Sequence, residues 1–269
     1  MHRITQGEDA RVLAGERREN ILASLNTQGQ VTVGELARRF HVSEETVRRD
    51  LEELEKQGLA RRVHGGAMPE GKTRLETPYD TRRRTNVASK QLIARLASEL
   101  VRDGEYIMMD ESSTSFYLST QLKGHKNLTV ITNSIEIIGE ISSVEGWTVM
   151  CTGGVKRFSA PSFAGHVAES MVSGYHVDKA IISCDSVSID AGFTDRHEDT
   201  ALIKRAMMRS ARQVVLLCDH TKLDRTAFAS IGSLNEIDFF VTDAPLDAQW
   251  RETLLARGVK LICPEEETE

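Results

Sequence analysis

Residues 87–269 alternate between short apolar runs and longer segments with helical periodicity, and this alternation constrains the fold more than any other feature. Seven runs read YIMM, LTVIT, WTVMC, KAIISC, VVLLC, FFVT and VKLIC. Apolar strands that alternate with helices form a mostly parallel sheet covered by helices on both faces. The pattern therefore predicts a Rossmann-like α/β domain, with helices at 87–102, 114–122, 134–143, 163–173, 198–211 and 247–256.

Small or acidic polar residues follow most of these strand-like runs. In an open α/β sheet the carboxyl ends of parallel strands lie at one edge, and ligands bind outside that edge. We therefore expect one ligand site to be built from the residues at the strand ends. They are Asp110, Asn133, Gly153, Gly154, Asp185, Asp219 and Asp243.

The N-terminal part of the chain has a different pattern. Helical periodicity at 17–26, 33–40 and 43–58 is followed by RRVHGGAM, which is typical of two short extended segments with a turn at the two glycines. Helix, helix, tight turn, helix and β-wing is the order of a winged helix-turn-helix. We predict a flexible N-terminus over 1–15, a winged helix-turn-helix over 16–68, a polar linker over 69–86 and the α/β domain over 87–269.

The third predicted helix has the properties of a DNA reader. Ser43 is a good N-cap, and the helical spacing of its apolar residues turns the polar ones outward. Hydroxyls and guanidiniums on an exposed helix face suit phosphate and base-edge contacts in a major groove. Asp50 is expected to brace Arg48 or Arg49. The predicted DNA-binding residues on the helix and the wing are Ser43, Thr46, Arg48, Arg49, Arg61, Arg62 and His64.

The charge distribution agrees with this assignment. Residues 1–90 hold 17 Lys and Arg against 14 Asp and Glu, whereas residues 91–269 hold 17 against 26, although the whole chain has a net charge of −6. A basic front end on an acidic protein indicates polyanion binding at the N-terminus. A solvated helix face in a protein-binding module is the alternative that charge alone leaves open.

Composition excludes several other classes. No apolar run approaches the roughly 20 residues of a membrane span, and residues 1–15 lack a signal-peptide core, so a cytoplasmic protein without a membrane partner is predicted. Cys151, Cys184, Cys218 and Cys263 are isolated in or beside apolar runs, which favours buried thiols over disulfides or metal ligands. Neither a metal nor a cofactor is predicted.

Three motifs carry a family resemblance: RxxxIxxxL at 17–25, SxxTVRRDL at 43–51, and ELEKQGLARRVHGGAM at 53–68. With this spacing the chain resembles the DeoR/GlpR family of bacterial sugar-metabolism regulators, and the resemblance continues more weakly through the rest of the sequence. It implies a C-terminal sensor domain similar to sugar-phosphate isomerases and coenzyme A transferases.

The family carries an Asp-x-Gly-Thr-Thr loop after the first strand of the sensor, where this chain has DESST at 110–114. Hydroxyls at a helix start can form a phosphate site with the backbone N–H groups. Lys204 or Lys222 would neutralise phosphate charge, and Asp110 or Asp219 would accept sugar hydroxyls. Ser112 replaces the usual glycine and SCDS at 183–186 replaces a glycine-containing segment, so the usual effector is not assumed. The implied effector-binding residues are Asp110, Ser112, Ser113, Thr114, Asn133, Gly153, Gly154, Asp185, Lys204, Asp219 and Lys222.

The resemblance implies a homo-oligomeric repressor, dimer or tetramer, that binds double-stranded operator DNA and is released by a phosphorylated sugar. Two other classes stay open. Asp110, Asp185 and Asp219 could act as general bases in a sugar-phosphate enzyme, but no catalytic constellation has recognisable spacing, so an enzyme is not predicted. The α/β domain could also serve only to oligomerise a DNA-binding protein.

Overall fold

The chain divides into two compact units, residues 1–77 and 78–269, each considered by itself. No helix in the described part of the chain is both long and apolar enough to cross a membrane. The structure is a computed structural model that describes residues 14–28, 31–57, 59–63, 65–69, 79–157 and 160–264.

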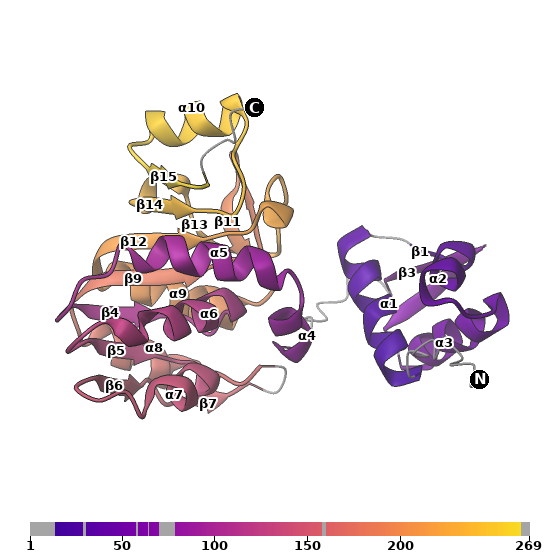
Figure 1. Cartoon of the computed structure of the whole chain (residues 1–269), viewed down its shortest axis with the longest axis horizontal. Helices are drawn as coiled ribbons and strands as arrows, with labels where there is room; N and C mark the ends of the chain where they lie inside the picture. The colour runs from indigo at the N-terminus through magenta and orange to yellow at the C-terminus, as the bar shows by residue number, and fades with distance from the viewer. Residues whose placement is uncertain are drawn as a thin grey trace, which may run out of the picture. The chain divides into compact units, whose positions relative to one another are not determined.

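The first unit is a winged helix-turn-helix, as predicted (Figure 1). Its wing is a three-stranded antiparallel sheet in the order β1-β3-β2, in which the two-residue strand β1 was not predicted. The core is formed by Ile21, Leu25, Val47, Leu51 and Leu54, all at most 1% exposed. The elements are α1 (Ala14–Gln28), β1 (Val31–Thr32), α2 (Val33–Phe40), α3 (Glu44–Lys56), β2 (Ala60–Val63) and β3 (Gly66–Pro69).

Two backbone features fix this unit. His41 has a left-handed conformation, φ 52°, and its N–H donates to the carbonyls of Ala37 and Arg38, which ends α2 and makes the tight turn before α3. A Cβ at Gly66 would lie 2.0 Å from the carbonyl oxygen of Val31, so only glycine permits β3 to approach β1.

The second unit is built on a seven-stranded sheet in the order β15-β14-β12-β9-β4-β5-β6, in which every pair is parallel. Each strand falls on one of the apolar runs, and the Rossmann-like prediction is confirmed. The strands are β4 (Tyr106–Met109), β5 (Thr129–Thr132), β6 (Thr148–Cys151), β9 (Val177–Ser183), β12 (Ala211–Leu217), β14 (Phe239–Val241) and β15 (Lys260–Ile262).

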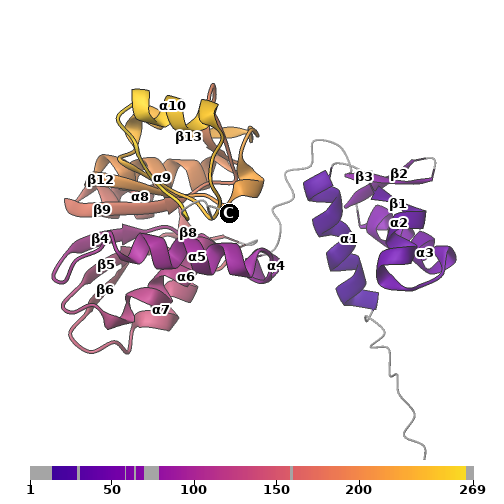
Figure 2. The same cartoon turned by 45° about the horizontal axis from the view of Figure 1, so that its top comes forward.

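Helices cover both faces because successive strand residues point to opposite sides. Ile181 packs in one core with α5, α6 and α7, whereas Ile182 packs in the other with α8, α9 and α10. Figure 2 shows α5, α6 and α7 together on one face. The helices are α5 (Val87–Ser98), α6 (Ser113–Gln121), α7 (Ile135–Ile141), α8 (His166–Ser173), α9 (Glu198–Arg209) and α10 (Ala248–Ala256), with 3₁₀ turns η1 (Leu122–Gly124), η2 (His220–Lys222) and η3 (Leu234–Glu236).

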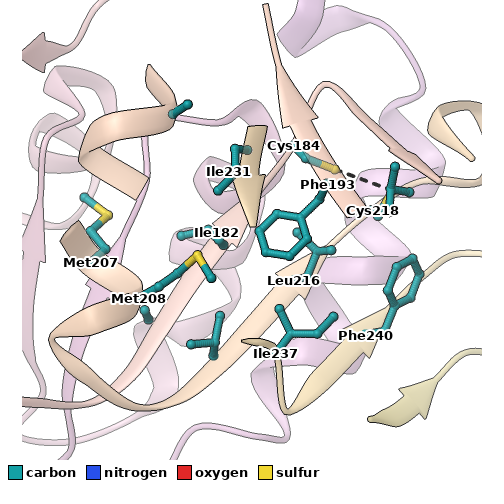
Figure 3. Close-up of a cluster of buried hydrophobic side chains, with 14 of the residues drawn as sticks. Ile182, Cys184, Phe193, Met207, Met208, Leu216, Cys218, Ile231, Ile237 and Phe240 are labelled. Atoms are coloured by element: carbon teal, nitrogen blue, oxygen red, sulfur yellow. Dashed lines mark hydrogen bonds between the residues drawn. The ribbon is translucent and has the colours of Figure 1, made fainter. Parts of the chain in front are cut away.

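Several elements of this unit were not predicted. A short helix, α4 (Tyr79–Arg84), lies inside the segment 69–86 that the sequence assigned to a linker. A small antiparallel sheet, order β10-β11-β13, packs on one face, and Figure 3 shows its Phe193 among Ile182, Leu216 and Phe240. The unpredicted strands are β7 (Val155–Lys156), β8 (Phe163–Ala164), β10 (Ser186–Ser188), β11 (Gly192–Asp195) and β13 (Ala229–Gly232).

The cysteines follow the prediction only in part. Cys184 and Cys218 are buried at the ends of neighbouring strands, with their sulfurs 4.0 Å apart (Figure 3). Cys151 is exposed, so its predicted burial is wrong. Its strand, β6, is the edge strand of the large sheet, which explains the exposure.

Candidate functional site

The strand order reverses between β4 and β9, because the chain runs from β4 outward through β5 and β6 and then returns to the other side of β4. Such a reversal is where ligands bind in open α/β sheets. Asp110 follows β4 at this position, is fully buried, and receives hydrogen bonds from Ser183 N–H (2.8 Å), the Ser115 hydroxyl (2.5 Å) and Ser112 N–H (3.2 Å). These donors fix the carboxylate in one orientation.

Lys204 of α9 lies against this carboxylate. It is 3% exposed, and its Nζ is 2.8 Å from Asp195 Oδ2 and 3.3 Å from Asp110 Oδ2. Burial alone would lower the pKa of Lys204, but Asp195, Asp110 and Glu111 raise it above its ordinary value. Burial would likewise raise the pKa of Asp195, but the Lys204 ammonium holds it below its usual range. Lys204 therefore has less free charge to offer a phosphate than the sequence suggested.

Glu111 is a site residue that the sequence reasoning missed. It is 2% exposed, accepts a hydrogen bond from Asn133 Nδ2 (2.9 Å), and lies 4.0 Å from Arg157. Burial, opposed by Lys204 and reinforced by Asp110, raises its pKa. Its position directly after a strand-end aspartate was the available signal. Asp195, also missed, belongs to the unpredicted strand β11.

A second charged cluster follows β12. Lys222 Nζ donates to the Cys184 carbonyl (2.8 Å) and the Ser183 hydroxyl (3.2 Å), and lies 3.8 Å from Asp219 Oδ2. Burial alone would lower the pKa of Lys222, but Asp219 raises it. Ser183 joins the two clusters, because its N–H donates to Asp110 while its hydroxyl accepts from Lys222.

Lys90, in the first turn of α5, was also missed. It is 5% exposed, and burial, together with the charge of Lys222, lowers its pKa to about 8 against the opposing charge of Asp219. Its burial inside a polar sequence, TRRRTNVASK, gave no apolar signal to find.

The predicted hydroxyl cluster divides into different roles. Ser112 is the N-cap of α6, since its Oγ accepts from Ser115 N–H (3.0 Å) and donates to the Ser115 hydroxyl (2.9 Å). Ser113 is buried beside it. Thr114 is buried, and its hydroxyl has no hydrogen-bond partner within the described residues. The Ser112 hydroxyl is therefore occupied in capping α6, whereas the Thr114 hydroxyl could still bond to a ligand.

Thr114 is one of several such groups in the second unit. The Asn133 Oδ1 and Thr200 hydroxyl are also buried, and both lack a hydrogen-bond partner in the described part of the chain. Asn133 contacts Glu111, and Thr200 lies one helical turn before Lys204. Because buried polar atoms are almost always hydrogen-bonded, these atoms fit a site that is completed by a polar ligand.

The remaining predicted effector residues have local structural roles. Asp185 accepts from Arg196 Nε at 2.8 Å. Gly153 and Gly154 both have positive φ, and a Cβ at Gly154 would lie 2.8 Å from the Ala164 carbonyl oxygen, so packing against β8 requires that glycine. Within the residues that the structure describes, no hydrogen bond or ion pair joins these three residues directly to Asp110.

The predicted DNA-reading surface of α3 is exposed. Ser43 Oγ accepts from Thr46 N–H (3.2 Å) and caps the helix. Arg48 pairs with Glu44 (2.8 Å), and the side chain of Arg49, 78% exposed, lies 3.5 Å from Glu45. Exposed pairs of this kind contribute about 0–1 kcal/mol, so both arginines can exchange their partners for DNA phosphates.

On the wing, Arg61 is exposed and Arg62 pairs with Glu52 of α3 at 2.5 Å, while His64 lies outside the described residues. The predicted role of Asp50 is wrong. Its carboxylate is buried and accepts from Arg17 Nε of α1 at 2.6 Å. Residues one or two positions apart on a helix do not face each other, so Asp50 could not brace the neighbouring arginines.

A winged helix-turn-helix attached to a Rossmann-like unit with a buried polar site is the architecture of a DNA-binding regulator that carries a sensor domain. Residues 17–70 match the DeoR-like helix-turn-helix domain, and residues 85–244 match the DeoR C terminal sensor domain. The chain therefore belongs to the DeoR family, as the sequence motifs predicted, and is a transcriptional regulator, not an enzyme.

Similar proteins support this assignment over nearly the full length. The uncharacterized HTH-type transcriptional regulator YulB of Bacillus subtilis is 36% identical, over 93% of this chain and 96% of that protein. The HTH-type transcriptional repressor GlcR of the same organism is 34% identical, over 94% and 97%. The glycerol-3-phosphate regulon repressor of Escherichia coli K12 is 29% identical, over 91% and 97%.

Proposed function

We propose that this protein represses a carbohydrate-utilisation operon in the cytoplasm, and that a phosphorylated sugar bound at the carboxyl ends of β4, β9 and β12 releases it from DNA. The observation that carries the proposal is the buried polar site at the strand-order reversal. Two charged clusters, Asp110 with Lys204 and Asp219 with Lys222, meet there through Ser183.

The chemistry of the two clusters suits the two ends of such an effector. Carboxylates accept hydrogen bonds from sugar hydroxyls, and the fixed Asp110 is placed for this role. Lys222 pairs with a single carboxylate at 3.8 Å, whereas Lys204 lies among three, so Lys222 is the better phosphate ligand. The name of one relative, the glycerol-3-phosphate regulon repressor, supports a phosphorylated ligand.

Release follows from a population shift. We assign DNA binding to residues 16–68 and effector binding with oligomerisation to residues 79–269, because α4, inside the segment 69–86 predicted as a linker, packs on the second unit. A dimer or tetramer joined through the second unit would present paired readers to repeated half-sites, whose spacing must match the protein. An effector that binds better to a conformation with different reader spacing lowers DNA affinity by that difference.

Fluorescence anisotropy of the full chain on labelled DNA from upstream of its own gene tests this proposal. We expect release by one member of a panel of phosphorylated sugars, such as glucose 6-phosphate, fructose 1-phosphate and glycerol 3-phosphate, at concentrations where the unphosphorylated compounds have no effect. Equal release by the unphosphorylated compound would contradict the phosphate role. If nothing releases the DNA, the second unit serves oligomerisation alone.

Matched variants separate the two activities. Lys222→Met is expected to bind DNA normally and to need at least about tenfold more effector for release, because a charge-assisted contact is worth about 1.5–3 kcal/mol. Lys260→Met removes an exposed lysine on β15 and serves as the control. A normal dose response from Lys222→Met would remove that residue from the site.

A further inference from the structure

The short helix α4 packs against α6 near the carboxyl edge of the sheet, and its backbone carbonyls accept hydrogen bonds from side chains of the second unit. Lys90 Nζ donates to the carbonyl oxygens of Arg82 and, at 2.6 Å, Thr85. The Tyr117 hydroxyl of α6 donates to the Arg83 carbonyl at 2.9 Å. Figure 1 shows α4 beside the ends of α5 and α6. Backbone carbonyls of α4 are thus held by side chains of the two helices that follow it.

The segment 79–90 also contacts elements on both sides of the candidate effector site. On one side the Arg83 guanidinium lies 4.0 Å from the centre of the Phe116 ring and pairs with Glu136 of α7 at 3.2 Å. On the other side Asn86 Nδ2 donates to the Thr221 hydroxyl at 3.3 Å, in the turn that carries Asp219 and Lys222. The segment therefore connects the β4–β5 side of the site with the β12 side.

Tyr79, the first residue of α4, carries a hydroxyl that the fold does not use. The residue is 4% exposed, and its Oη has no hydrogen-bond partner within the described ranges. Burial, with the charges of Glu136 and Asp110 also acting on it, raises the pKa of this phenol, so it stays a hydrogen-bond donor. A phenylalanine would fill the same volume without burying an unpaired hydroxyl, which is normally costly.

We propose that α4 covers the effector site and that the Tyr79 hydroxyl donates a hydrogen bond to the bound effector, which makes Tyr79 a specificity-determining residue. The inference rests on the proposed function, since it assigns an additional contact to the same site. Thr114, Asn133 and Thr200 supply unpartnered polar atoms at the same edge, so the effector would complete several hydrogen bonds at once. In the sequence, α4 directly follows residues 70–78, the segment between the two units. An effector bound to Tyr79 would therefore contact the chain next to that segment.

The test uses the full-length protein, its Tyr79→Phe variant, and Tyr175→Phe as a control at an exposed tyrosine. The probes are glucose 6-phosphate, fructose 1-phosphate and glycerol 3-phosphate in the anisotropy assay. For a neutral hydroxyl partner we expect Tyr79→Phe to need about 3- to 10-fold more probe for half release, with DNA affinity in the absence of probe unchanged. The Tyr175→Phe response should equal that of the wild type.

A second readout does not depend on DNA. Incorporation of 3-fluorotyrosine gives four ¹⁹F resonances, one for each tyrosine, and the one missing in Tyr79→Phe identifies Tyr79. We expect this resonance to shift when the releasing probe is added. A Tyr79→Phe dose response within twofold of wild type, together with an unshifted resonance, would overturn the inference while the proposed function stands. A wild-type protein that responds to none of the probes would overturn both.

Discussion

The buried ammonium of Lys204 gives the sharpest prediction, because three carboxylates depend on it. Lys204→Met would leave Asp110, Asp195 and Glu111 at most 8% exposed and without their common cation. Removing one partner of a buried ion pair costs about 3–5 kcal/mol, a large part of the roughly 5–15 kcal/mol that stabilises a typical domain. With a urea dependence of about 2 kcal/mol per molar, the unfolding midpoint should fall by roughly 1.5–2.5 M.

Tryptophan fluorescence follows this transition selectively. The two tryptophans of the chain, Trp147 and Trp250, both belong to the second unit, so urea titration of the full chain reports its unfolding. Trp250 is 2% exposed and its Nε1 donates to Asp224 at 3.0 Å, which makes it sensitive to loss of the core. Lys123→Met is the matched control, because Lys123 pairs with Glu140 at the surface and should contribute about 1 kcal/mol or less.

A double variant separates the charge effect from simple loss of packing. Lys204→Met with Asp195→Asn removes one charge of each sign, and the asparagine oxygen can still accept from Arg196 N–H. We expect the double variant to recover about 2 kcal/mol, or roughly 1 M of urea, relative to Lys204→Met alone. A single-variant shift below about 0.5 M, or no recovery in the double variant, would refute the view that Lys204 compensates these carboxylates.

Three further predictions concern both units. Arg49→Ala is expected to weaken operator binding by about 1–3 kcal/mol when measured by anisotropy, and an equal loss on scrambled DNA would assign it to phosphate instead of base contact. Asp50→Ala removes the buried carboxylate that pairs with Arg17 and should destabilise the first unit by about 3 kcal/mol, seen as an earlier far-ultraviolet circular dichroism melt, with partial recovery on adding Arg17→Met. Glu111→Gln should flatten the stability–pH curve above pH 4.5: the raised pKa means that the folded state holds more protons than the unfolded state, so wild-type stability falls as pH rises from 4.5 through the folded pKa. Equal slopes for wild type and variant in urea titrations would contradict the last prediction.

The sequence was sufficient for the large sheet because its strands are buried on both faces. Runs such as VVLLC have apolar residues at every position, and β12 accordingly contributes to both cores. Apart from α4, the helices were equally accessible through their periodicity, and Ser43 was recognised as the N-cap of α3. The small sheet was missed because β10 and β11 contain serine, glycine and aspartate, residues that favour turns. Phe193 is the apolar residue of β11 that packs deep in the core.

The sequence indicated the edge of the sheet where the candidate site lies, but not which side chains pair with one another there. Strand ends placed Asp110 and Asp219 at one edge, because parallel strands share a direction. The pairing of Lys204 with Asp195 depends on how the small sheet folds back onto α9, which local patterns do not encode. Tyr79 was hidden for a different reason, since it lies in a polar stretch that resembles a linker until its contacts with the second unit are known.

The energetic character of this buried polar site fits the proposed binding role. Buried ion pairs are weak sources of stability, and apolar residues of similar volume are often as good or better. Here the second unit buries Asp110 and Lys204 almost completely and leaves the hydroxyls of Thr114 and Tyr79 without partners among the described residues. None of these groups serves the cores that hold the sheet, which are apolar on both faces. An effector that supplies the missing partners would stabilise the conformation in which α4 packs over the site. The difference between its affinities for this and other conformations is the free energy that can shift the population that binds DNA.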